Sequence, residues 1–131
     1  MINELQKSIY ARLSDQVTTA EVFDHMPASK DYPCVIIGDD LSRENDTDTE
    51  NGFDTILTIH SWVSDPNQRG YANLNLIMEE IYNALHWYDL TVTGYGVSGI
   101  FQEFSEKMRD SDGITRHGIQ RFRVYFEPLG A

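Results

Sequence analysis

Histidine and cysteine are common transition-metal ligands, and the sequence contains four histidines and one cysteine. The histidines are His25, His60, His86 and His117, and none of them is paired with another histidine or with Cys34 at the spacing of a metal site. The pattern therefore predicts no zinc site. Cys34 stands in an apolar run, which favours a small buried residue over a nucleophile, and a single cysteine excludes an internal disulfide.

A carboxylate-rich segment at residues 46–52 superficially resembles a calcium-binding loop. If Asp46 were the first ligand of an EF-hand, the required glycine would stand at position 51, where the chain has Asn51. The bidentate glutamate would stand at position 57, where the chain has Leu57. The sequence therefore excludes an EF-hand, and weak calcium binding through the density of carboxylates stays open.

The usual sequence signatures of catalysis are missing. The sequence has no glycine-rich phosphate loop ending in Lys-Ser/Thr and no Gly-x-Ser-x-Gly nucleophile elbow. The glycines of residues 94–99 follow no buried parallel strand and precede no helix, so they indicate a bend in the chain. We expect a protein that is not an enzyme and that needs no cofactor.

Basic residues gather in the segment 109–123, which holds four of the ten lysines and arginines of the chain: Arg109, Arg116, Arg121 and Arg123. One interpretation is a solvated hairpin with cross-strand pairs between arginines and carboxylates. The other is docking between subunits, in which the arginines bind carboxylates of a neighbour. Both interpretations stay open.

Acidic residues dominate the segment 39–54, where seven carboxylates accompany one basic residue, Arg43. The whole chain has a net charge of −11, which argues against a general nucleic-acid binder because phosphate affinity comes from clustered basic side chains. The segment is either a solvated loop or a surface that repels a polyanion or meets a basic partner.

Two helices are expected to support these segments. Leu5, Ile9 and Leu13 recur at helical spacing and predict a helix over residues 2–14. A second apolar stripe runs from Leu74 to Leu85 and predicts a helix that ends near residues 86–89. Before this stripe, Asp65 and Pro66 are suited to the cap and first position of a helix.

Strands are expected in the rest of the chain. A short extended stretch is predicted at residues 22–24, and a buried strand starts after Pro33 and stops at Gly38. Residues 53–63 carry bulky groups on both faces, and with the preceding strand they predict a long hairpin whose tip is the acidic segment. Residues 90–92 and 97–108 are read as extended, and a turn at 111–113 leads into a last strand with one core face and one wet or partner face.

The predicted fold class is α+β, a mainly antiparallel mixed sheet with two helices packed on it and a long acidic β-hairpin loop. At 131 residues the chain has the size of one domain, spanning residues 1–131. Its apolar runs are far shorter than the ~20 residues that cross a bilayer, so no membrane association is expected. The first residues lack the pattern of a secretory signal, which predicts a cytoplasmic product.

In these residues the chain resembles the tail completion proteins of long-tailed bacteriophages, also called tail terminator or tail-to-head joining proteins. The most distinctive segment is 112–122, which reads Asp-Gly-x-Thr-Arg-His-Gly-x-x-Arg-Phe. The resemblance covers nearly the whole chain in order. Its other blocks are the first helix and the segments 22–24, 32–38, 57–62, 81–86 and 90–94. Cys34 departs from the family pattern, and the acidic segment is heavier than is typical.

The resemblance implies a structural subunit of a phage or prophage virion that forms a hexameric ring on the tail tube. Such a ring ends tube elongation, docks the head-tail connector or stopper, and lets DNA pass without specific binding. It implies a location at the neck-proximal end of the tail after assembly in the bacterial cytoplasm. A closed ring needs two different complementary patches on each subunit. The candidate interface residues are Asp46, Asp48, Glu50, Arg109, Arg116, His117, Arg121 and Arg123.

Other uses of these features stay open. The acidic residues could instead line the bore of the ring, where negative walls keep DNA from sticking. The alternative from another class is a small soluble acidic ligand-binding or regulatory domain with weak calcium binding. A third is a small hydrolase with an unrecognised site.

Overall fold

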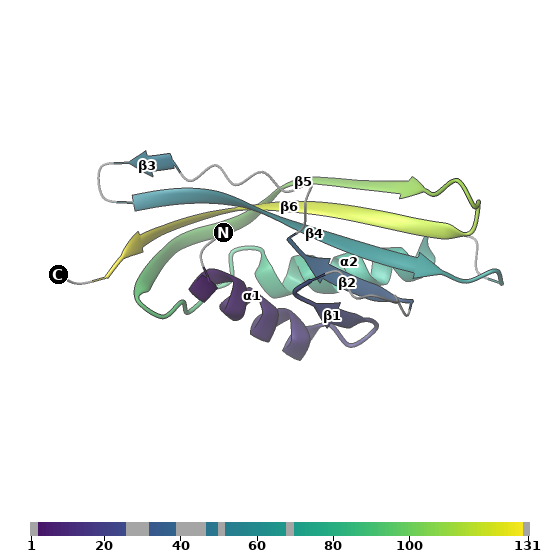
Figure 1. Ribbon diagram of the computed structural model, residues 1–131, viewed down its shortest axis with the longest axis horizontal. Helices are drawn as coiled ribbons and strands as arrows, with labels where there is room; N and C mark the ends of the chain where they lie inside the picture. Colours follow the sequence, from purple (N-terminus) through teal and green to yellow (C-terminus); the bar gives the residue numbers. More distant parts are fainter. Residues whose placement is uncertain (1–2, 26–31, 39–46, 50–51, 68–69, 130–131) are drawn as a thin grey trace.

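The structure of the protein is a computed structural model, and it describes residues 3–25, 32–38, 47–49, 52–67 and 70–129. Figure 1 shows an elongated molecule in which long strands form one layer and both helices lie beneath it. The described elements are α1 (Asn3–Gln16), β1 (Glu21–Phe23), β2 (Cys34–Ile37), β3 (Thr47–Thr49), β4 (Gly52–Ser64), α2 (Ala72–Leu85), β5 (Tyr95–Arg109) and β6 (Thr115–Pro128).

The strands form one sheet in the order β1-β2-β4-β6-β5, with β3 paired to the beginning of β4. β1 and β2 run parallel, whereas the pairs β2–β4, β4–β6 and β5–β6 are antiparallel. The predicted fold class, a mainly antiparallel mixed sheet that carries two helices, is confirmed. The predicted pairing of the strands on either side of the acidic segment is confirmed too, although residues 39–46 and 50–51 of that segment lie outside the described residues.

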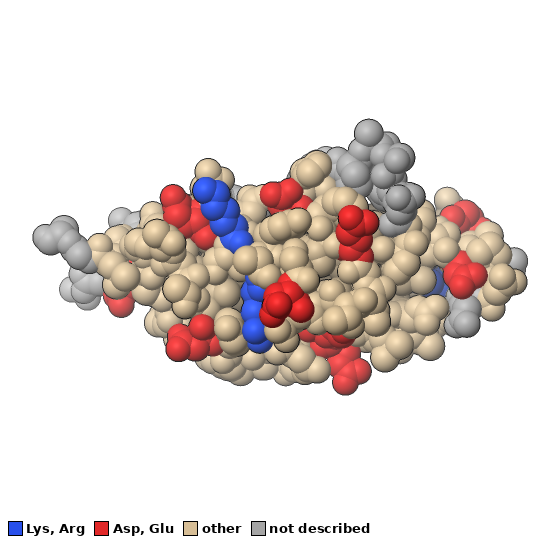
Figure 2. All heavy atoms as spheres, turned by 90° about the horizontal axis from the view of Figure 1, so that it is seen from below, with Lys and Arg blue, Asp and Glu red and all other residues tan. Residues whose placement is uncertain are grey.

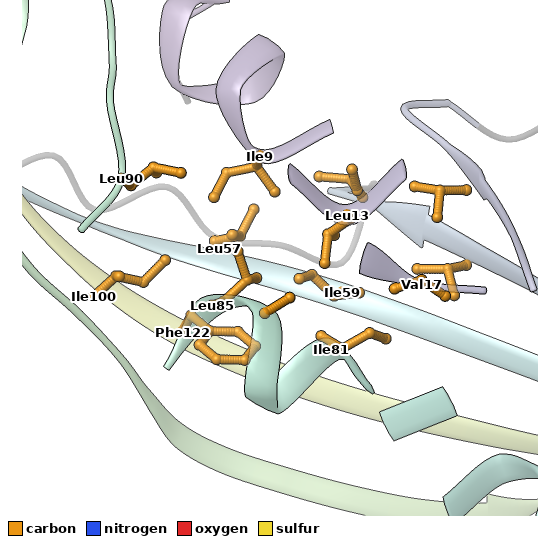
Figure 3. Close-up of a cluster of buried hydrophobic side chains, with 14 of the residues drawn as sticks. Ile9, Leu13, Val17, Leu57, Ile59, Ile81, Leu85, Leu90, Ile100 and Phe122 are labelled. Atoms are coloured by element: carbon orange, nitrogen blue, oxygen red, sulfur yellow. The ribbon is translucent and has the colours of Figure 1, made fainter. Parts of the chain in front are cut away.

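The core lies between the helices and one face of the sheet, as Figure 3 shows. The predicted stripe of α1 is buried through Leu5, Ile9 and Leu13, each at most 1% exposed. The stripe of α2 faces the same core, together with Leu57 and Ile59 of β4 and with alternate residues of β6. Because these side chains meet in one cluster, the helical and the strand periodicities of the sequence are satisfied by the same packing. The alternate β6 residues are Phe122, Val124 and Phe126.

The second helix begins later than the sequence predicts. Asp65 does not cap it, because its Oδ1 accepts a hydrogen bond from the backbone N–H of Asn67 at 2.9 Å and closes a turn. α2 starts at Ala72, and Tyr71 precedes it without a side-chain cap. The expectation that Pro66 is the first helical residue is wrong, since the turn at Asp65 uses the carboxylate that would have served as the cap.

The last strand differs from the expectation in its first half. Residues 121–126 alternate between a buried and a more exposed face, as predicted. Residues 115–120, in contrast, are buried on both faces. On the face away from the helices, His117 lies flat against Trp62 of β4 with ring centroids 3.7 Å apart. The face of this half of the strand that was expected to meet solvent or a partner is therefore covered by packed side chains.

Surface charge is unevenly distributed on the helix side of the molecule. Figure 2 shows carboxylates scattered over most of this face, whereas lysine and arginine side chains form one band across it. α1 carries two of the basic residues, Lys7 and Arg12. Arg12 is engaged, because its Nε donates to the carbonyl of Ala84 at 2.9 Å and its guanidinium lies over the ring of Tyr88.

Candidate functional site

The β5–β6 hairpin carries most of the described candidate residues, and a carboxylate fixes its turn. Asp112 Oδ1 accepts hydrogen bonds from the backbone N–H groups of Ile114 and Thr115, each at 2.8 Å. The Thr115 hydroxyl donates to the other oxygen at 2.6 Å. These bonds, those from Thr115 first, lower the pKa of Asp112 below its ordinary value. Gly113 follows with a φ of 75°, a left-handed conformation that glycine adopts without strain.

Arg116 and His117 follow this turn on opposite faces of β6, and both are buried in the subunit. The guanidinium of Arg116 lies over the ring of Tyr71 at 5.4 Å, and its Nη1 donates to the carbonyl of Gly113 at 3.0 Å. His117 Nε2 lies 2.7 Å from His60 Nδ1, so one imidazole donates a hydrogen bond and the other accepts it. These contacts lie within one copy of the chain, so Arg116 and His117 belong to its internal packing.

Arg123 forms a cross-strand cluster on the sheet face away from the helices. Its Nε donates to Glu103 Oε2 at 2.9 Å, and its Nη1 donates to Asp54 Oδ2 at 3.0 Å. The hydrogen bond and charge of Glu103, with those of Asp54, raise the pKa of Arg123 despite partial burial. This is the geometry of the solvated-hairpin interpretation, and the cluster ties β4, β6 and β5 together.

The remaining arginines of the hairpin are exposed. Arg121 lies beside Arg123 on the same face, with its guanidinium 4.7 Å from the centre of the Phe104 ring. Arg109 is the last residue of β5 and projects at the end of the molecule that holds the turn. The structure therefore brings Arg121 and Arg123 onto one face, buries Arg116 on the helix side, and leaves Arg109 at the edge of the sheet.

The three acidic candidate residues belong to the segment between β2 and β4. Asp46 and Glu50 lie outside the described residues. The backbone of Asp48 belongs to β3, where it pairs with Phe53 of β4. The role of these three residues at an interface stays a prediction.

An arrangement that the sequence analysis missed lies along the outer edge of β5. The backbone N–H of Trp87 donates to the carbonyl of Ile100 at 2.7 Å, and the N–H of Gln102 donates to His86 Nδ1 at 3.1 Å. Trp87 has a φ of 56°, which is rare for a bulky residue. The residue is 66% exposed, and its ring stacks on the ring of Phe101. In the sequence, His86 and Trp87 indicated only the end of a helix, because nothing local shows that a strand lies opposite.

A groove of about 250 Å³ follows the same edge farther along, between α2 and β5. Lys107 Nζ donates to Asn75 Oδ1 at 2.7 Å across it. At its floor Gln120 Nε2 donates to the carbonyl of Met78 at 3.0 Å and to Gln102 Oε1 at 2.8 Å. The groove thus exposes amides, a hydroxyl and charges beside the side chains of Met78 and Tyr82, next to a strand edge.

Three further features concern metal binding, the single cysteine and membrane-spanning helices. Within the described ranges, no three His, Cys, Asp or Glu side chains gather where they could hold a metal ion. Cys34 is buried in β2, as predicted. None of the described helices is both long and apolar enough to cross a bilayer.

Comparison with known proteins identifies similar chains. The family model described as tail completion protein gp17 matches residues 7–127. Tail completion protein gp17 of Bacillus phage SPP1 is 27% identical over 123 residues, covering 91% of this chain and 89% of that protein. The solved structure of SPP1 gp17 matches with a TM-score of 0.58 at 22% identity and covers 96% of this chain and 88% of its own.

A second solved structure is more similar in backbone geometry. A chain in the virion of a native gene transfer agent particle matches with a TM-score of 0.74 at 21% identity. The match covers 94% of both chains. At this identity the likeness shows a shared fold.

Proposed function

Because the chain belongs to the tail completion protein gp17 family, we propose that it is a structural tail terminator that caps the tail tube as a ring of copies. The ring ends tube elongation and forms the docking surface for the head connector. The observation that carries this proposal is the family match over residues 7–127, almost the whole chain. It favours assembly over a ligand-binding or regulatory domain.

The proposed partners are copies of the chain itself in a hexameric ring, the tail tube protein and the head-tail connector or stopper protein. DNA passes through the ring without specific binding, in agreement with a net charge of −11. In this proposal residues 1–131 act as one domain at the neck-proximal end of the tail, after assembly in the host cytoplasm. The role needs no catalysis and no cofactor.

The surfaces proposed for ring formation include the hairpin arginines and the acidic segment. Arg109 and Arg121 are exposed, so they are available to a neighbouring copy in the subunit as it stands. Arg116, His117 and Arg123 are engaged within one copy, and their proposed part is to hold the hairpin that presents the surface. Asp46, Asp48 and Glu50 supply the opposite charge.

The proposal is tested by solution mass, measured by sedimentation or light scattering with and without the tail tube protein. We expect a monomer or a labile oligomer at low concentration and a ring at high concentration or on tubes, since binding to a tube end stabilises the assembled state by mass action. Electron microscopy of capped tubes should show tubes of uniform end structure. A stable dimer with two-fold symmetry and no larger form would contradict the proposal.

A further inference from the structure

The end of α2 is joined to the edge of β5 at two neighbouring points, which we call the occupied edge. The carbonyl of Ile100 accepts a hydrogen bond from the N–H of Trp87, and the N–H of Gln102 donates to His86 Nδ1. Alternate residues of a strand direct their backbone groups to the same side, so the two bonds lie next to each other. At the second point a titratable ring, and not a backbone carbonyl, holds the N–H of the strand.

The bond to Gln102 determines which nitrogen of His86 carries the proton. A backbone N–H group can only donate, so Nδ1 accepts and is unprotonated, and the proton of the neutral ring is on Nε2. The ring of Tyr82 stacks on the imidazole with centroids 4.3 Å apart and keeps it in this orientation. His86 is half-buried, so protons of the solvent can reach it. Only the neutral ring, in this one tautomer, can make the bond.

The backbone next to His86 is held in an unfavourable conformation. α2 ends at Leu85, and Trp87 then takes a φ of 56°, in the left-handed region that is unfavourable for a bulky residue. Its ring stacks on Phe101 with centroids 5.4 Å apart, and a Cβ atom built on Gly99 would lie 3.3 Å from Trp87 Cζ3. Contacts with β5 therefore offset the cost of this turn, and the turn can relax when those contacts weaken.

Charges of both signs surround the ring of His86. The carbonyl end of α2 attracts a cation, and so do exposed carboxylates nearby. The basic groups Arg12 and Lys107 have hydrogen-bond partners of their own, as Glu103 has. Charge alone therefore does not decide which form of the ring fits the occupied edge, whereas the hydrogen bond to Gln102 does. The titratable and charged groups around His86 in the described chain are Glu79 and Tyr82 of α2, Arg12 of α1, Tyr88 and Asp89 of the following turn, and Glu103 and Lys107 of β5.

We propose that His86 is a pH-sensitive latch: its neutral ring keeps the end of α2 bound to β5, and a proton on Nδ1 releases it. A protonated Nδ1 is a donor, so it would face the N–H of Gln102 with no acceptor between them. The bound form excludes a proton that the released form takes up, so the latch is closed at neutral pH and above and opens as the pH falls. This inference goes beyond the proposed function and does not depend on it.

Amide hydrogen exchange of the full chain, measured by NMR between pH 8 and pH 5, tests the latch, since histidine ordinarily titrates in this range. The protection factor of the Gln102 amide, corrected for the intrinsic pH dependence of exchange, should fall by about tenfold for each pH unit once the ring takes up its proton, because opening then binds one proton. The Trp87 amide should lose protection with it. The Val17 amide, which donates to the Leu13 carbonyl in another part of the molecule, is the internal reference and should keep its protection.

Three variants separate the latch from other effects of pH. His86→Asn keeps an accepting oxygen near the position of Nδ1 but does not titrate, so the protection of Gln102 should no longer depend on pH. His86→Phe keeps a ring against Tyr82 but has no acceptor, so Gln102 should exchange rapidly at every pH. His25→Asn removes an exposed histidine beside Asp24, and its pH profile at Gln102 should match that of the wild type.

Each of these measurements can overturn the proposal. Protection of Gln102 that does not change with pH in the wild type, or that falls equally in His86→Asn, would show that His86 is not the latch. Imidazole nitrogen chemical shifts report directly where the proton is, and a proton on Nδ1 at neutral pH would also contradict the proposal. If His86→Phe does not fold, the comparison of the wild type with His86→Asn still decides the question.

Discussion

At the residue scale, Glu80 holds the turn between α1 and β1 against α2. Its two carboxylate oxygens accept hydrogen bonds from the backbone N–H groups of Thr18 and Thr19, each at 3.2 Å. Both threonine hydroxyls donate to it as well. Burial alone would raise the pKa of Glu80, but the bonds from Thr19 and Thr18 together outweigh burial and lower it. The ionised carboxylate of Glu80 therefore accepts four hydrogen bonds from a turn that lies outside the sheet.

Glu80→Gln should lower the free energy of unfolding by about 1–2 kcal/mol at neutral pH, since an amide cannot replace both accepting oxygens and the site is partly solvated. Because the folded pKa lies below the ordinary 4.5, the contribution of Glu80 is complete above that pH and is lost as pH falls through the folded value. Denaturant titrations from pH 7 to pH 3 should show the two proteins converging in stability. A difference that stays constant over this range would assign the effect to packing.

At the element scale, α2 rests directly on β6 at a glycine. A Cβ atom built on Gly118 would lie 2.5 Å from Met78 Sδ and 3.2 Å from Leu74 Cδ1. The close approach lets the helix lie flat on the strand, and it brings the Met78 carbonyl within reach of Gln120. Gly118 thus sets the distance between the helix layer and the sheet.

Gly118→Val should destabilise the fold by about 1–3 kcal/mol, because extra volume in a packed interface forces side chains and backbone apart. Shortening the opposing side chain should relieve the clash, so Met78→Ala combined with Gly118→Val should cost less than the sum of the two single changes. Chemical denaturation of the wild type, the two single variants and the double variant measures the coupling free energy between Gly118 and Met78. Additive losses would show that the helix shifts as a body and that Met78 does not limit its approach.

The elements themselves were largely predictable from the sequence, and their junctions were not. The stripe of Leu5, Ile9 and Leu13 and the alternation of β6 follow from periodicity, which is a local property. The start of α2 was missed because Asp65 could serve either a cap or a turn, and only the three-dimensional path selects one. The occupied edge at Trp87 depends on a contact between the end of a helix and a distant strand, so no local pattern reveals it.

The same limit applies to the candidate site. The sequence showed that four arginines belong to one hairpin, but it could not separate those packed inside the subunit from those on its surface. Arg116 and Arg109 belong to one hairpin, yet the first is 2% exposed and the second is exposed at the edge. Burial depends on which face of the strand a residue occupies and on what packs there, as Tyr71 does on Arg116.

At the scale of the whole molecule, the proposed assembly into a ring must overcome the excess negative charge of each copy. The net charge is −11, and more than half of it belongs to the segment 39–54. Self-repulsion of this size favours separate copies in dilute solution. In the proposed ring, contacts between unlike charges on neighbouring copies would offset this repulsion.

If the side chains of Asp46, Asp48 and Glu50 face solvent, neutralising them together to Asn or Gln should leave the melting temperature nearly unchanged, because exposed charges contribute little to folding. If these residues meet a basic neighbour, ring formation on tubes should decrease, and more at low salt than at high salt. Screening is the reason, since the Debye length is about 30 Å at 0.01 M and about 8 Å at 0.15 M.

If the acidic residues instead line the bore of the ring, the same triple variant should behave differently. Rings should form normally, and the neutralised rings should retain DNA in a filter-binding assay. If neither ring formation nor DNA retention changes, the segment is a solvated loop. Wild-type rings at matched salt are the control for both assays.

The hydrogen bonds that Trp87 and His86 make to β5 also bear on the behaviour of the protein at high concentration. A strand edge without a partner can pair with an edge of another chain and start aggregation. The N–H of Trp87 binds the carbonyl of Ile100, and His86 Nδ1 accepts from the N–H of Gln102, so these backbone groups of β5 cannot bind a foreign strand. The end of α2 therefore protects part of this edge from uncontrolled aggregation.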